Sequence, residues 1–332
     1  MKSIFTSLSF LPLLLGIQSC SKAEQDQKPA IKDTVVVVKP PPVVTDTLPK
    51  SNYDLSLLEK CTLFTSVPTV TVLKNQDHME LSGLAQSQRY PGLLYVHEDS
   101  GNANEVYMTN TAGDDLGKII LDGVSNRDWE DIAYGPGPDA AKKYIYVAEI
   151  GDNDAIYKSI FVYRFAEPDL TNPDQQTVTH VTPDKLQFVY PTGAVNAESL
   201  MLDPATKDLY ITTKETSRST LYVARYPQSA TTTTTLTPLA KFPFDLLTSA
   251  DISPDGTEII IRDTGQIWYW KRLSNETIVK AMLRQPQDAP YAGNEHQGEG
   301  ICFAADGTGY FTTSETKKFP GDKSSLSFYK RK

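Results

Sequence analysis

Alternating apolar and polar residues predict five copies of one β-hairpin between residues 51 and 332. Each copy begins with an acidic or small residue, any residue and a Leu or Ile, and continues through a turn into an aromatic-aliphatic strand that ends in a charged residue. The copies join residues 82–84 to 94–98, 130–132 to 145–149, 198–200 to 209–214, 250–252 to 259–262, and 299–301 to 310–315. Pro, Gly and Asp occupy the intervening turns, which these residues favour.

The spacing of the hairpins predicts a β-propeller. The copies begin at positions 82, 130, 198, 250 and 299, which lie 48, 68, 52 and 49 residues apart. A four-stranded propeller blade takes about 40–50 residues, and blades must stack around an axis to cover their apolar faces. We therefore expect an all-β fold, a β-propeller of five or six four-stranded blades. The 68-residue step holds either one enlarged blade or a degenerate sixth.

The two ends of the repeat region each carry one further strand-like segment. Val67–Leu73 precedes the first hairpin and Leu326–Tyr329 follows the last. Joining them in one blade would close the ring, as propellers require to avoid exposed sheet edges.

The N-terminal residues predict export and a lipid anchor. Lys2 and the apolar run Ile4–Ile17 form a secretory signal that is too short to span a membrane. Leu14 to Cys20 resembles a lipobox, which implies cleavage after residue 19, lipidation of Cys20 and, because Ser21 follows, sorting to the outer membrane. Residues 20–50 contain many Pro residues and no aromatic residue, so they are expected to form a flexible tether to a propeller at residues 51–332.

The net charge of the chain indicates which classes of partner it can bind. A formal charge of −9, with no stripe of Lys and Arg, argues against a nucleic-acid partner. Cys61 and Cys302 can either pair in an oxidising compartment or remain buried thiols.

Hairpin geometry predicts where the charged residues gather. The first strand of each hairpin begins at the end where the second finishes, so several acids should converge at one mouth of the propeller. The candidates for a metal or ligand site are Glu98, Asp99, Glu130, Glu149, Asp152, Glu198, Glu299 and Glu315. Oxygen-rich clusters of this kind suit Ca²⁺, although such acids can equally accept backbone N–H bonds or pair with neighbouring cations.

Basic residues and histidines extend this set of candidates. Arg127, Lys214 and Arg262 would form an anion site for phosphate or carboxylate. His97 and His296 adjoin Glu98 and Glu299, where either could act as a base or a ligand.

Four short motifs resemble known propeller groups. Residues 126–133 (NRDWEDIA), 149–153 (EIGDN) and 296–301 (HQGEGI) resemble bacterial secreted propellers of the phytase-like and NHL-like groups, and residues 253–256 (SPDG) are similar to the turn of the TolB-type repeat. The resemblance covers roughly residues 78–316. It implies the fold more than any activity, because propellers carry many functions.

Two functions and one structural role remain open. The first is a tethered binding module whose acidic mouth, supported by Ca²⁺, recognises a ligand or protein. The alternative is a metal-dependent hydrolase of phosphoesters or other esters, in which the metal activates water. The third is a purely structural envelope protein.

Overall fold

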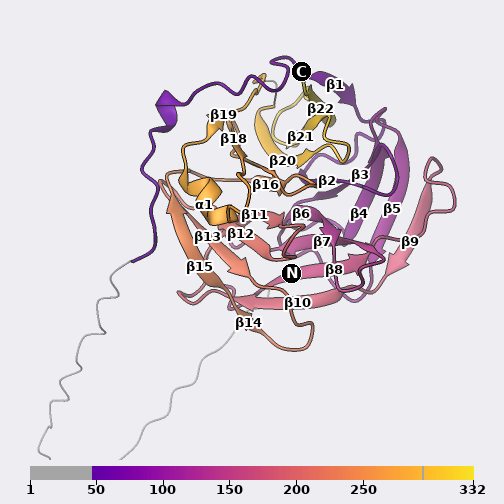
Figure 1. Cartoon of the computed structure of the whole chain (residues 1–332). Helices are drawn as coiled ribbons and strands as arrows, with labels where there is room; N and C mark the ends of the chain where they lie inside the picture. Colours follow the sequence, from indigo (N-terminus) through magenta and orange to yellow (C-terminus); the bar gives the residue numbers. More distant parts are fainter. Residues whose placement is uncertain (1–46, 294) are drawn as a thin grey trace, which may run out of the picture. The chain divides into compact units, whose positions relative to one another are not determined.

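Five separate β-sheets surround a central axis in the computed structural model, which describes residues 47–293 and 295–332 (Figure 1). The predicted all-β propeller is confirmed, and it has five blades. The predicted signal peptide, Cys20 and most of the predicted tether lie outside the described residues. Among the described residues, no helix is long and apolar enough to cross a membrane.

The blades are numbered here in chain order. Blade 1 contains β2 (Leu81–Gln86), β3 (Leu93–Glu98), β4 (Glu105–Asn110), β5 (Asp115–Leu121) and β9 (Thr177–Val181). Blade 2 contains β6 (Trp129–Pro136), β7 (Lys143–Glu149), β8 (Ile160–Ala166), β10 (Asp184–Val189) and β14 (Thr234–Thr235). Blade 3 contains β11 (Ala197–Leu202), β12 (Leu209–Thr213), β13 (Ser219–Ala224) and β15 (Thr237–Phe242).

The remaining elements complete the ring. Blade 4 contains β16 (Ser249–Ile252), β17 (Glu258–Arg262), β18 (Ile267–Lys271) and β19 (Gln287–Asp288). Blade 5 contains β20 (Gln297–Phe303), β21 (Gly309–Glu315), β22 (Ser325–Lys330) and β1 (Thr69–Val72). Among the described residues, the helices are the single-turn 3₁₀ helix η1 (Leu55–Leu57) and α1 (Ile278–Leu283), which begins at the N-cap Thr277 and packs against blades 3 and 4.

The long step between the second and third hairpins contains no sixth blade. β10 pairs with β8 as the fourth strand of blade 2. β9 instead runs back to blade 1, where it pairs in parallel with β5 as a fifth strand. The extra length therefore enlarges existing sheets.

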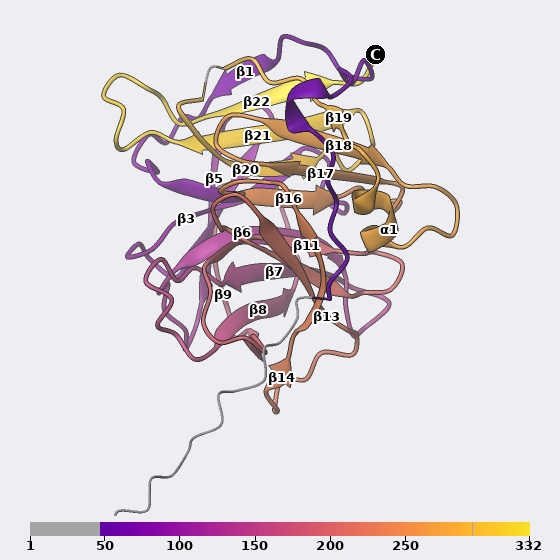
Figure 2. The ribbon, with the colours of Figure 1, turned by 90° about the vertical axis from the view of Figure 1, so that its left-hand side faces the viewer.

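The predicted closure of the ring is confirmed. β1 pairs antiparallel with β22, so the beginning and the end of the propeller share blade 5. Residues 47–68, called the belt below, run along the outer edges of three blades before reaching β1 (Figure 2). Lys50 bridges to Lys241 in β15, Lys60 to Asp288 in β19, and Phe64 to Arg331 after β22.

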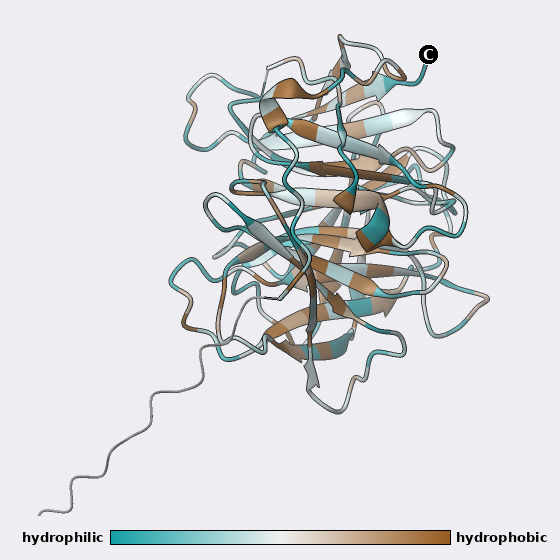
Figure 3. Cartoon of the chain, turned by 60° about the vertical axis from the view of Figure 1, so that its left-hand side comes forward, coloured by the Kyte–Doolittle hydropathy of each residue, from teal (hydrophilic) through white to brown (hydrophobic). Residues whose placement is uncertain are grey.

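Apolar side chains fill each of the five interfaces between adjacent blades. Five buried clusters lie between blades 1 and 2, 2 and 3, 3 and 4, 4 and 5, and 5 and 1. Hydrophobic residues, brown in Figure 3, recur along the strands that supply these clusters. Trp129 packs in the first of these interfaces, and Trp268 and Trp270 pack in the third. Cys61 and Cys302 are buried free thiols in different clusters, and they do not form a disulfide.

The five inner strands β2, β6, β11, β16 and β20 surround the axis without belonging to a common sheet (Figure 1). Their inward N–H groups therefore need side-chain acceptors. Asp131, fully buried in β6, accepts hydrogen bonds from Leu200 N (2.9 Å), from Ser249 Oγ (2.9 Å) and from Ala250 N (3.3 Å). Asp251 in β16 likewise accepts from Phe303 N (2.8 Å) in β20. These carboxylates connect blades that no backbone ladder joins.

We predict that Asp131→Ala lowers the free energy of unfolding by about 3–5 kcal/mol, because it leaves the Leu200 N–H and the Ser249 hydroxyl buried without their acceptor. Urea unfolding followed by fluorescence measures the change. Asp154→Ala, an exposed loop variant, is the control and should stay within about 0.5 kcal/mol of the parent protein. Equal midpoints for the two variants would contradict the role assigned to Asp131.

Candidate functional site

The charged residues gather at the end of the propeller where the inner strands begin, called the axial mouth below. Residues at the start of β6, β11 and β20 pair in register with the ends of the second strands, as Trp129 does with Glu149 and Gln297 with Glu315. Glu130, Glu198 and Glu299 lie on the inner strands β6, β11 and β20, and the charge of each raises the pKa of Lys214.

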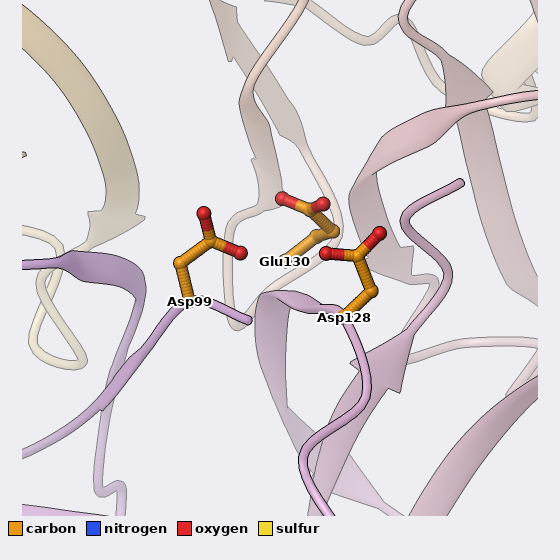
Figure 4. Close-up of side chains that lie close together, drawn as sticks. All are labelled: Asp99, Asp128 and Glu130. Carbon is orange, nitrogen blue, oxygen red and sulfur yellow. The ribbon is translucent and has the colours of Figure 1, made fainter. Parts of the chain in front are cut away.

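Three carboxylates from two blades form the tightest group at this mouth. Asp99 follows β3, Asp128 precedes β6 and Glu130 lies within β6; one oxygen from each lies within 4.8 Å of the others (Figure 4). Glu130 is only 4% exposed, and among the described residues its carboxylate accepts no hydrogen bond. A buried carboxylate without a donor is costly unless a cation or a proton neutralises it.

Gly151 provides the space that this group occupies. A Cβ atom at Gly151 would lie 2.1 Å from Glu130 Oε1 and 2.5 Å from Asp128 Cγ. Its N–H donates to Asp128 O at 3.2 Å, which holds the loop after β7 against the start of β6. The NRDWEDIA and EIGDN motifs therefore build one site together.

Lys214 neutralises the opposite side of the mouth. Its ammonium forms an ion pair with Glu198, and its side chain is 21% exposed. Gln297 donates to Glu299 Oε1 (3.1 Å) and to Glu315 Oε2 (2.6 Å), and so separates these two acids. Lys214 thus forms the ion pair with a neighbouring acid that the sequence left open as the alternative to a ligand site.

Burial and mutual repulsion raise the pKa values of the mouth carboxyls. Burial and then the charge of Glu198 raise the pKa of Glu299 to about 8. Burial also raises the pKa of Glu198 to about 7, despite the opposing ion pair with Lys214. The pKa of Glu130 is raised well above its usual value by burial and by the charges of Glu198, Asp99 and Asp128.

Burial and neighbouring charges also shift the pKa values of Asp128 and Lys214. Burial and the neighbouring Asp99 raise the pKa of Asp128 to about 6. Burial alone would lower the pKa of Lys214, but Glu198, Glu299 and Glu130 outweigh it and raise the value. The mouth without a bound cation is therefore partly protonated near neutral pH.

Three of the predicted acids serve other purposes. Glu98 faces His78 (3.5 Å) and accepts from Tyr107 Oη. Glu149 accepts from Trp129 Nε1 (3.1 Å) and Tyr163 Oη (2.9 Å) and pairs with Arg127. Asp152 accepts from Ile156 N and Tyr157 N, which shapes its own loop. Each of these carboxylates already has donors within the protein.

The remaining basic candidates also lie in internal contacts. Arg127 stacks on the Tyr157 ring at 3.8 Å beside Glu149. Arg262 was expected at the mouth as an anion ligand, but it is fully buried, 2.9 Å from Glu295, and donates to the carbonyls of Gly300 and Thr313. Its guanidinium is therefore a structural link between blades 4 and 5.

The two histidines differ from the expected arrangement at the mouth. His97 is fully buried, packed where a Cβ on Gly83 would approach its Nε2 to 2.3 Å, and burial lowers its pKa to about 4. It has no access to a ligand as a base. His296 is exposed, pairs with Asp322 (2.6 Å) and stacks on Phe319.

Sequence reasoning did not select Asp128 and Gly151 as site residues. Both occur inside the quoted motifs, but Asp128 precedes the strand start that the repeat highlights, and Gly151 carries no ligand atom. The available signal was the presence of Asp128 and Glu130 two residues apart in NRDWEDIA, since side chains two residues apart in a strand point to the same side.

Comparisons of the chain with protein-family models and with curated proteins find no match. The resemblance to phytase-like, NHL-like and TolB-type propellers therefore remains a prediction based on short motifs.

We predict that the free energy of unfolding of the metal-free protein falls as pH rises from about 5 to 8. Folded Glu299, with a pKa of about 8, keeps its proton while unfolded glutamate, with a pKa of about 4.3, has lost it, so rising pH favours the unfolded state. Glu299→Gln should reduce this slope by up to about 1.4 kcal/mol per pH unit. Urea titrations at several pH values, with a chelator present, measure the slope of the unfolding free energy against pH. An unchanged slope in Glu299→Gln would contradict the raised pKa of Glu299.

Proposed function

We propose that this chain is a lipid-anchored, extracytoplasmic β-propeller that binds a ligand or a protein partner at its axial mouth. In this proposal Asp99, Asp128 and Glu130 hold a Ca²⁺ ion that supports the binding surface. The observation that carries it is the proximity of the three carboxylates, of which one oxygen each lies within 4.8 Å of the others, with Glu130 only 4% exposed.

The ligand chemistry favours a hard divalent cation. All three side chains offer carboxylate oxygens, and Ca²⁺ takes 6–8 oxygen ligands in flexible geometry. Zn²⁺ instead prefers the nitrogen and sulfur ligands of His and Cys. Asp99 at the rim leaves part of the coordination sphere open, so water or an oxygen of the bound partner would complete it.

The location of the protein rests on its N-terminal sequence. A lipid on Cys20 and a tether of roughly 30 residues would keep the propeller near a membrane without fixing its orientation. We predict that Cys20→Ser abolishes incorporation of labelled palmitate and moves the protein from the membrane fraction to the soluble fraction. Continued labelling and membrane recovery of this variant would overturn the anchor, while Ser21→Ala serves as the control that keeps both.

A metal-dependent esterase is the second candidate, and one observation favours it. Glu198 and Glu299 have pKa values of about 7 and 8, the range in which a carboxyl group works as a general acid or base near neutral pH. Against it, the many acids at this mouth repel a phosphoester.

We predict that calorimetry of the purified protein detects Ca²⁺ binding that Gly151→Ala abolishes. The added Cβ would lie 2.1 Å from Glu130 Oε1 and so displaces the carboxylates from one another. Gly265→Ala is the matched control, because a Cβ there meets no atom within 4 Å. Ca²⁺ should also raise the melting temperature of the parent and the control but not of Gly151→Ala.

Failure of the parent protein to bind Ca²⁺ would overturn the cation site. The same proteins, assayed for phosphate or carboxylate release from aryl esters, discriminate between the two candidates. Turnover that needs Ca²⁺ and disappears in both Gly151→Ala and Glu299→Gln supports the esterase, whereas no turnover in any protein supports the binding module.

A further inference from the structure

We propose that a groove at the end of the propeller opposite the axial mouth binds a neutral oligosaccharide. This groove, called the far groove below, lies between blades 5 and 1, where the inner strands β2 and β20 end. Two cavities of about 380 and 180 Å³ form it, and both are lined by Gln86, Gly92 and Asp306. The larger cavity falls within the range of about 300–1,000 Å³ in which ligand sites occur. The inference does not depend on the proposed cation site.

Aromatic side chains form the floor of the far groove. Phe311 in β21 and Phe328 in β22 stack with their ring centroids 4.5 Å apart, and Leu326 belongs to the same apolar cluster. Phe311 and Leu326 are buried, whereas Phe328 remains partly exposed. The apolar packing between blades 5 and 1 therefore ends at this pair of rings, which gives the groove a flat apolar surface. The C–H face of a sugar ring can pack on such a surface.

Uncharged hydrogen-bonding groups line the walls of the far groove. The Gln86 carboxamide accepts from Ala305 N at 2.7 Å, but its Nε2 donates to no acceptor among the described residues. The hydroxyl groups of Thr69 and Thr111 also have no hydrogen-bond partner within residues 47–293 and 295–332. Hydroxyl and carboxamide groups can both donate and accept hydrogen bonds, so they match the hydroxyl groups of a sugar.

The charges around the far groove disfavour an anionic ligand. No Lys or Arg of the described part of the chain lines either cavity, so a phosphate or carboxylate would find no counter-ion there. The one carboxylate in the lining, Asp306, accepts from Thr308 N (3.0 Å) and Thr308 Oγ1 (2.6 Å) through Oδ1 alone. Its Oδ2 can therefore accept from a hydroxyl group of a sugar.

Asp306 connects the far groove to a third cavity. This cavity, of about 380 Å³, continues from Asp306 toward blade 4. Its two basic side chains already have a partner, because Arg331 and Lys271 lie 2.6 Å and 3.8 Å from the carboxylate of Glu258. The continuity of the three cavities favours a chain of sugar units over a monosaccharide.

Calorimetry of the full-length protein with maltohexaose, cellohexaose and chitohexaose tests the proposal. At least one of these neutral hexasaccharides should bind with a Kd of about 1 mM or tighter. Thr111→Arg, which extends a long side chain from an exposed turn beside the groove, should weaken this binding at least about tenfold. Thr62→Arg is the matched control and should leave the affinity unchanged, because Thr62 is an exposed threonine that lines a separate cavity beside the belt.

A second variant tests the free carboxamide group. Gln86→Glu keeps an acceptor for Ala305 N and removes the N–H donor, so it should weaken saccharide binding about threefold or more. Thermal unfolding and circular dichroism establish that each variant is folded. Hexagalacturonate, an anionic hexasaccharide, should bind the parent protein more weakly than the neutral probes, because the groove offers it Asp306 and no cation.

Three outcomes would overturn the proposal. The first is that none of the three neutral hexasaccharides binds the parent protein. The second is that Thr111→Arg binds as tightly as the parent, or that Thr62→Arg is the variant that loses binding, which would place the saccharide beside the belt. The third is that an uncharged Ser/Gly hexapeptide binds in place of the saccharides and is lost in Thr111→Arg, which would assign the groove to a peptide. None of these outcomes bears on Ca²⁺ binding at the axial mouth.

Discussion

The structure depends on how five inner strands satisfy their backbone groups without sharing a sheet. Around the axis, each inner strand faces neighbours from other blades, and no ladder of N–H and carbonyl groups connects them. Buried acceptors replace that ladder: Asp131 links blade 2 to blades 3 and 4, Ser249 accepts from Ile301 N, and Asp251 links blade 4 to blade 5. Apolar packing brings the blades together, but these polar contacts set the position of each inner strand relative to its neighbours.

The arrangement of the inner strands also determines which charged groups meet at the axial mouth. Once the inner strands are fixed at their starts, acids at those starts must lie close together in a poorly solvated space. Burial and the mutual repulsion of these acids raise the pKa values of Glu130 and Glu299. The ammonium of Lys214 pairs with Glu198, and the amide of Gln297 donates to both Glu299 and Glu315. In the Asp99–Asp128–Glu130 group, Asp99 accepts a hydrogen bond from Ser100 N, but the Glu130 carboxylate accepts none among the described residues, which is why we propose the cation at this group.

Much of the fold could be predicted because hairpin register and blade length are local properties of the sequence. The turn residues, the 48-to-68-residue spacing and the strand at each end sufficed for the propeller and its closure. The destination of β9 could not be predicted, since a strand edge in another blade is a long-range partner. The site was predicted only in outline. The positions of Arg262 and His97 in the sequence predicted that both lie at the mouth, but the side chains of both are buried inside the protein. No sequence pattern distinguishes Asp131, a structural hydrogen-bond acceptor, from Glu130 one residue before it.

The pairing of β1 with β22 has a consequence for how the chain is made. β1 is among the first propeller segments to leave the ribosome, and its partner is the last, so the ring cannot close during synthesis. Until β22 arrives, the belt and β1 have no sheet edge in blade 5, and the faces of blades 1 and 5 that meet in the closed ring stay exposed. An incomplete chain is thus kept open by its own topology, so the pairing of the final strand is the step that completes the native fold.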